Sequence, residues 1–234
     1  MYLFAHLFTG LIIGLGFFYL WNDRRLIPVC VAGSLFPDLL DKTLVFLIPG
    51  FFGSTRTIGH TLLFFAVTAL AALIVWYRYR SVIGIACATT VLVHQLLDLM
   101  WTLPVTWFFP LNGMFPFVPV AGGYLQFLVT ELTNPSEWVF AIASALIILC
   151  GCAGLPGIGP SSLSGRNTAI LQYGTAGLLG ITGAWLIMTG MDPVSGTGTA
   201  LSAGPDKTLV AGLVAVTGAV VLFLVSGLKR PVSR

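Results

Sequence analysis

The sequence predicts an all-α membrane protein, a polytopic bundle of transmembrane helices. The chain has 234 residues, of which 57% are hydrophobic and only 8% are charged. Soluble domains carry roughly 25% charged residues, so this chain cannot cover itself with a polar surface. The mean hydropathy of +0.97 leads to the same conclusion. This composition excludes a disordered chain, a disulfide-stapled secreted scaffold and a nucleic-acid-binding protein.

Apolar windows along the chain predict the number of crossings, because a spanning helix takes about 20 residues. Six windows are long enough: 1–20, 58–77, 81–103, 137–154, 169–190 and 207–228. The stretch from Leu26 to Pro49 is also long enough, although it contains Pro37 and several charged residues. Proline removes a helical hydrogen bond, so we expect a seventh crossing that is broken at Pro37 beside a polar cavity. The prediction is therefore about seven crossings, the second one broken.

Two longer connections separate the windows. Residues 104–136 are rich in aromatic side chains and proline, which indicates a lid at the membrane interface, and residues 191–206 form a Gly/Ser/Thr-rich loop. Neither has enough apolar residues to fold as a soluble domain. We expect residues 1–125 to form one membrane domain with the lid, and residues 126–234 to form an apolar three-helix region packed on it.

The basic residues predict the orientation, because short cytoplasmic loops collect Lys and Arg. With the N-terminus outside and the C-terminus inside, eight of the eleven basic residues fall on the cytoplasmic side: Arg24, Arg25, Arg78, Arg80, Arg166, Lys229, Arg230 and Arg234. The first window has no basic residue and no cleavage motif close behind it, so we expect it to be retained. The predicted location is the cytoplasmic membrane, with the lipid bilayer as its partner.

Ionisable residues are concentrated in the first half of the chain, inside windows where each costs roughly 2.5–3.5 kcal/mol on insertion scales. They are His6, Asp38, Asp41, His60, His94 and Asp98. Histidine and carboxylate side chains together are typical ligands of divalent transition metals. The set therefore predicts a buried metal site.

Their spacing and depth favour convergence. His94 and Asp98 are four positions apart, which places both on one helix face. Asp38 and Asp41 follow Pro37, and Thr61 adds an oxygen donor next to His60. At 1.5 Å per residue, the six side chains lie about 3–17 Å below the outer ends of their windows. We expect four crossings to bring these groups to one level.

Other interpretations use the same residues. Asp38 and Asp41 could form buried ion pairs with Lys42 or Arg56, so that the cluster only holds helices together. They could also belong to a cation or proton transporter. Transporters usually show a repeat with broken helices in both halves, and the second half here has no counterpart of Pro37. A non-enzymatic scaffold or transporter is thus the alternative to a metal-dependent enzyme.

Five segments follow one another along the first half of the chain: His6 with Gly10, Gly33 to Asp41, Arg56 to Thr61, His94 to Asp98, and Pro110 to Pro116. Their order resembles that of the YdjM-like family of inner-membrane, metal-dependent hydrolases, over about residues 1–120. That family is distantly similar to zinc-dependent phospholipase C and P1-type nucleases, in which His and Asp side chains hold a zinc cluster. The resemblance implies that the metal ligands are His6, Asp38, His60, His94 and Asp98.

The expected activity is hydrolysis of a phosphoester in a lipid or lipid-linked substrate, with one or two divalent ions, most simply Zn²⁺. Asp41 is expected to act as a general base or a further ligand. Arg56 is expected to neutralise the anionic phosphate, because a guanidinium pairs well with oxyanions. Both residues accompany the ligands in the resemblance.

Overall fold

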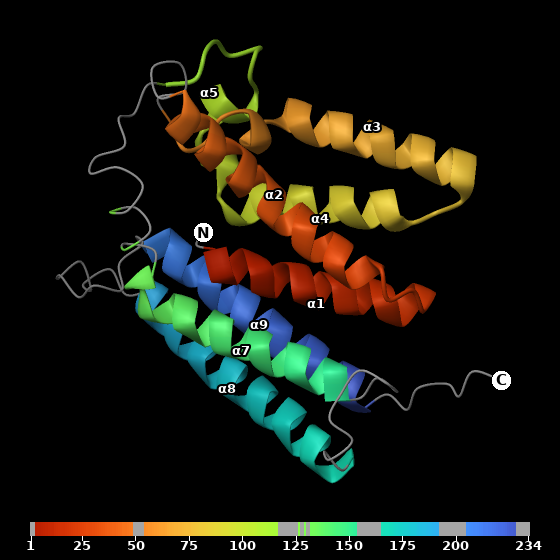
Figure 1. Cartoon of the computed structure of the whole chain (residues 1–234). Coiled ribbons are helices and arrows are strands. Elements are labelled where there is room, and N and C mark those ends of the chain that lie inside the picture. Colours follow the sequence, from red (N-terminus) through yellow and green to blue (C-terminus); the bar gives the residue numbers. More distant parts are fainter. Residues whose placement is uncertain are drawn as a thin grey trace. The chain divides into compact units, whose positions relative to one another are not determined.

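The computed structural model describes residues 3–48, 54–116, 126, 129, 132–153, 165–191 and 205–227, and within these ranges it contains helices and no strand (Figure 1). The helices are α1 (Leu3–Trp21), α2 (Leu26–Leu47), η1 (Ile58–His60), α3 (Leu62–Tyr79), α4 (Ile83–Leu97), η2 (Met100–Thr102), α5 (Pro104–Trp107), α7 (Pro135–Ala153), α8 (Gly165–Met191) and α9 (Pro205–Gly227). The predicted all-α class is confirmed.

Each of the seven sequence windows contains a long helix. By length and composition, 4 segments of the described chain can cross a membrane: Leu3–Trp21, Leu62–Tyr79, Ile170–Thr189 and Lys207–Leu224. Helices α4 and α7 hold shorter apolar segments, Ile83–Leu97 and Ser136–Leu149. A helical membrane protein is thus supported, and the count of seven crossings stays a prediction.

The predicted break at Pro37 is wrong: α2 runs from Leu26 to Leu47 with Pro37 inside it. One proline removes only the hydrogen bond to the carbonyl of Gly33 and leaves the turns on either side intact. Helices α1 and α4 pack along α2, and such neighbours keep a proline-containing membrane helix in place. The polar residues around Pro37 therefore project from a continuous helix.

The chain divides into two compact units, Met1–Thr133 and Asn134–Arg234. The expected boundary near residue 125, and the packing of the second region on the first, stay predictions. Part of the proposed lid, including Phe117 and Tyr124, lies outside the described residues. Within that segment, the described chain forms the short helix α5.

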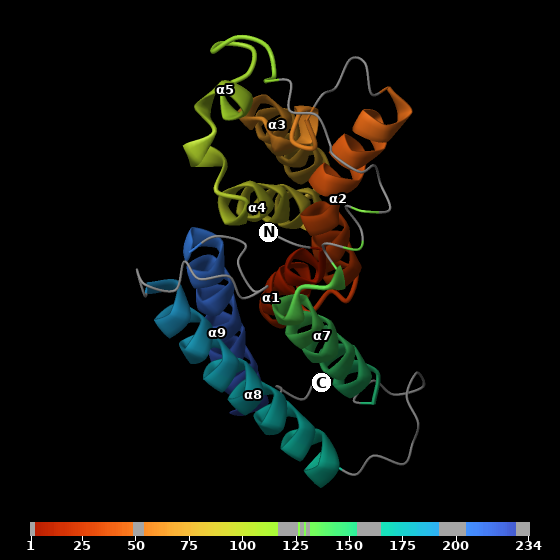
Figure 2. The same ribbon diagram turned by 90° about the vertical axis from the view of Figure 1, so that its left-hand side faces the viewer.

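In the first unit, α1 lies against α2, and α3 and α4 form a hairpin whose second helix also contacts α2 (Figures 1 and 2). Gly10 allows the close approach of α1 to α2. A Cβ atom there would lie 2.9 Å from both the Cys30 carbonyl oxygen and the Val31 Cα. Both atoms are backbone, so any side chain at position 10 would push the two helices apart.

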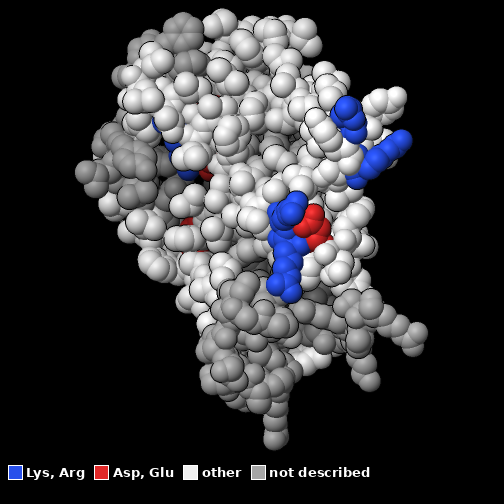
Figure 3. All heavy atoms as spheres, turned by 45° about the vertical axis from the view of Figure 1, so that its right-hand side comes forward, with Lys and Arg blue, Asp and Glu red and all other residues white. Residues whose placement is uncertain are grey.

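The exposed basic residues of the first unit lie at one end of its helices. Arg24 and Arg25 are in the turn between α1 and α2, while Arg78 and Arg80 are where α3 leads to α4. Figure 3 shows these exposed basic side chains gathered on one side of the described surface. The sequence predicts that this end is cytoplasmic, and that orientation stays a prediction.

The second unit contains α7, α8 and α9, with α8 and α9 in close contact. A Cβ atom on Gly183 would lie 2.8 Å from the Gly212 carbonyl oxygen. Small residues at such crossings are typical of helices that pack in membranes.

Candidate metal centre

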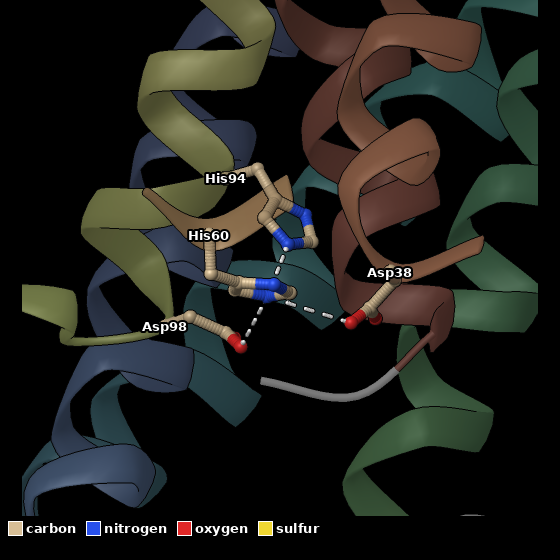
Figure 4. A group of neighbouring side chains, drawn as sticks. All are labelled: Asp38, His60, His94 and Asp98. Carbon is tan, nitrogen blue, oxygen red and sulfur yellow. Dashed lines mark hydrogen bonds and ion pairs between the residues drawn. The ribbon is translucent and has the colours of Figure 1, made fainter. Parts of the chain in front are cut away.

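Four buried side chains of the first unit converge on one point (Figure 4). Asp38 comes from α2, His60 from η1, His94 from the last turn of α4, and Asp98 from the residue that caps α4. One donor atom from each of these residues lies within 4.8 Å of the corresponding atoms of the others. Four of the five predicted ligands are thus brought together, from three segments far apart in the chain.

The distances from His60 Nε2 to the other three donors fit one metal ion. His60 Nε2 lies 3.1 Å from His94 Nε2, 3.4 Å from Asp98 Oδ2 and 3.6 Å from Asp38 Oδ1. Tetrahedral zinc with bonds of roughly 2.0–2.1 Å separates its donors by about 3.3 Å. Two imidazoles and two carboxylates also form a donor set that such an ion accepts.

The His60 ring is oriented by Asp41. His60 Nδ1 lies 2.7 Å from Asp41 Oδ2, and Asp41 also accepts hydrogen bonds from the backbone N–H groups of Thr57, at 2.6 Å, and Gly59, at 2.8 Å. A carboxylate can only accept, so Nδ1 carries a proton, and in the neutral ring Nε2 presents a lone pair. This hydrogen bond from a ligand histidine to a carboxylate is the usual outer support of a metal site.

The His94 ring is oriented by a backbone carbonyl. His94 Nδ1 donates to the carbonyl oxygen of Ser34, at 2.7 Å, in the turn of α2 that precedes Pro37. Its Nε2 therefore also presents a lone pair in the neutral ring. When both rings are neutral, two lone pairs face each other 3.1 Å apart with two carboxylates beside them. A bound cation would remove their repulsion.

Each of the two ligand carboxylates has a basic partner, on the second oxygen of Asp38 and on the same Oδ2 of Asp98 that faces His60. Lys42 Nζ lies 3.2 Å from Asp38 Oδ2, and Arg56 Nε lies 3.1 Å from Asp98 Oδ2. The side chains of Lys42 and Arg56 are 16% and 26% exposed, whereas those of the carboxylates are at most 6% exposed. The two basic side chains are therefore more exposed than the carboxylates that they contact.

His6 lies beside the four-residue group and not in it. Its Nε2 is 3.1 Å from Asp98 Oδ1, and its ring stacks on that of His94 with centroids 3.9 Å apart. These contacts favour a role in holding two of the ligands. Direct ligation by His6 stays a prediction.

The turn that carries His60 is fixed from several sides. Thr61 caps α3 by accepting from the N–H of Phe64, and its hydroxyl donates to the carbonyl of Ile58, so it supports the turn instead of adding a donor to the site. Gly59 packs against α2, where a Cβ atom would lie 2.7 Å from the Pro37 carbonyl oxygen. Only glycine fits this contact without a shift of backbone.

Gln95 is a further buried residue of the site that the sequence motifs did not single out. Its Nε2 donates to the carbonyls of Gly59, at 3.1 Å, and Thr61, at 2.9 Å, on both sides of His60. Its Oε1 accepts from Trp107 Nε1 of α5, at 3.2 Å. A buried amide in an apolar window needs such partners, and this is the signal that could have identified it.

A sequence model of the YdjM inner membrane protein family matches residues 1–158. The chain belongs to this family. The match extends beyond the segment 1–120 that carries the motifs and includes α7. It supports an integral membrane location for this YdjM family member. Neither curated proteins nor solved structures gave a match.

Proposed function

We propose that this YdjM family protein is a membrane-embedded, metal-dependent hydrolase that cleaves a phosphoester of a lipid or lipid-linked substrate. The observation that carries the proposal is the donor spacing of 3.1–3.6 Å around His60 Nε2. Asp38, His60, His94 and Asp98 would hold one divalent ion, with zinc the best match for this donor set. Such an ion would act as a Lewis acid and lower the pKa of a coordinated water toward 7.

The residues of this chain would orient and neutralise the substrate around that centre. Arg56 uses its Nε–H on Asp98, and a guanidinium has four further N–H donors that suit a phosphoryl group. Asp41 accepts three hydrogen bonds that hold His60 and its turn. These contacts favour a positioning role for Asp41 over the predicted role as general base.

The alternative is a non-enzymatic protein in which the cluster only joins helices or carries cations. The pairing of Lys42 with Asp38 and of Arg56 with Asp98 favours it, because these ion pairs neutralise the two ligand carboxylates without a metal. In that case a proton on His60 would take the place of the ion, and the protein would hold no stoichiometric metal.

Metal content and hydrolysis separate the two functions. Protein purified in detergent without chelator is analysed for bound metal and assayed on phospholipid and lipid-phosphate substrates. The hydrolase is expected to contain about one equivalent of a divalent metal, and His60→Ala is expected to remove both metal and activity. Metal-free protein that takes up no zinc, with an unchanged fold, would instead support the ion-pair scaffold.

A further inference from the structure

Lys42 is a charged residue of the site that the proposed function does not use. It lies one turn after Asp38 on the same face of α2 and pairs with Asp38 as Arg56 pairs with Asp98. Figure 3 shows basic and acidic atoms close together on another part of the described surface, away from the exposed arginines. Each candidate ligand carboxylate is thus shared between the buried centre and one partly exposed cation.

We propose that Lys42 and Arg56 together form an oxyanion site for a phosphoryl group, which becomes available when a divalent ion binds to the centre. This inference rests on the proposed function. Without the ion, the two basic side chains neutralise Asp38 and Asp98, and each stays paired with its carboxylate. A divalent ion takes over that neutralisation, so both cations can turn to an anion.

Electrostatics predict that Lys42 has opposite effects on the binding of the metal ion and on the binding of phosphate. A positive charge 3.2 Å from a ligand oxygen repels an incoming metal ion but attracts a phosphate. Removing that charge should therefore strengthen metal binding in the absence of an anion and weaken phosphate binding to the metal-loaded protein. A lysine that only stabilises α2 would produce no such reversal.

Binding of metal and anion should also be reciprocal, because a coupling free energy between two ligands acts equally in both directions. We expect phosphate to strengthen zinc binding about tenfold or more in the unmodified chain, as charge-assisted hydrogen bonds of this kind contribute. The coupling should fall several-fold when Lys42 is neutral. The phosphoryl group could belong to a lipid headgroup or to free phosphate, since both present the same oxygens.

Calorimetric titration of zinc into full-length protein in detergent tests the proposal. The titration is run without anion, with inorganic phosphate, and with phosphatidic acid in mixed micelles. Lys42→Met keeps the apolar stem, Lys42→Arg keeps the charge, and Arg78→Met is the matched control because Arg78 is exposed at the other end of the unit. We expect zinc to bind Lys42→Met about threefold or more tightly without anion, with most of the coupling lost. Lys42→Arg should retain the coupling, and Arg78→Met should match the unmodified chain.

The possible outcomes are distinct. Coupling with phosphatidic acid alone assigns the site to a lipid headgroup, and coupling with inorganic phosphate assigns it to the phosphoryl group itself. Zinc binding with equal coupling in Lys42→Met and the unmodified chain would overturn the role of Lys42 and leave the proposed function intact. A folded protein that binds no zinc would overturn both.

Discussion

The two compact units of the chain differ in what their helices bury. In the first, His6, Asp38, His60, His94 and Asp98 form one connected polar cluster with no more than 4% of any residue exposed. In the described part of the second unit, Thr175 and Thr217 bond to carbonyls of their own helices, and glycines allow α8 and α9 to approach.

This difference separates packing from chemistry within one apolar chain. The second unit shows that its helices can pack through small residues and helix-internal hydrogen bonds. Burying ionisable groups costs free energy, and helices can pack without burying them. The first unit concentrates that cost in one cluster of five ionisable residues. The second unit buries the Glu137 carboxylate, but the described residues form no further candidate metal-binding group around it. The cluster of the first unit is therefore where a function is to be sought.

The largest effect should follow from removing a ligand. His94→Ala takes away one of the four donors and the hydrogen bond to the Ser34 carbonyl, so zinc binding should be abolished. Thr175→Ala, which removes a buried hydroxyl from the second unit, should leave zinc binding unchanged. Calorimetry with size-exclusion chromatography as a folding control measures both. Equal zinc binding in the two variants would contradict the division between the units.

A smaller effect is expected from Asp41→Asn, which keeps the shape of the side chain but weakens the support of His60. Loss of such an outer partner typically lowers metal affinity 10–100-fold, and calorimetry with zinc measures it. If zinc affinity is unchanged and only the rate of hydrolysis falls, Asp41 is the general base after all.

Glycine substitutions compare close packing in the site with open helix surface in the second unit. Gly59→Ala would press a methyl group on the backbone of Pro37 and should lower the free energy of unfolding by about 1–3 kcal/mol. Gly177 has nothing within 4 Å of an added Cβ, so Gly177→Ala should be neutral or stabilise α8 by up to about 1 kcal/mol. Denaturation in detergent distinguishes them, and similar losses in both would argue against the tight contact at Gly59.

The smallest effect concerns the attachment of α5 to the site. Trp107→Phe removes the hydrogen bond to Gln95 and should cost about 0.5–1.5 kcal/mol, measured by the same denaturation. Gln95→Leu also removes the hydrogen bonds to the carbonyls of Gly59 and Thr61 and should cost more. If the Trp107 variant is the less stable of the two, Gln95 is not the main support of the turn.

The sequence predicted the parts of the site that depend on local spacing. The four-residue interval between His94 and Asp98 places the two side chains one turn apart, in the last turn of α4 and at its cap, and periodicity alone indicates this. The carbonyl of Ser34 has no side-chain signature, so its contact with His94 could not be read from residue types. The same holds for the continuity of α2 through Pro37, because it depends on the helices that pack beside it.

The candidate centre brings together three segments whose side chains no covalent cross-link joins: the middle of α2, the turn before α3 and the end of α4. A bound ion would therefore act as a removable cross-link. At a free concentration of 100 times its Kd, such a ligand adds about 2.7 kcal/mol to stability. In cells that are starved of the metal, the less stable protein would then be open to proteolysis, and its abundance would follow the metal supply.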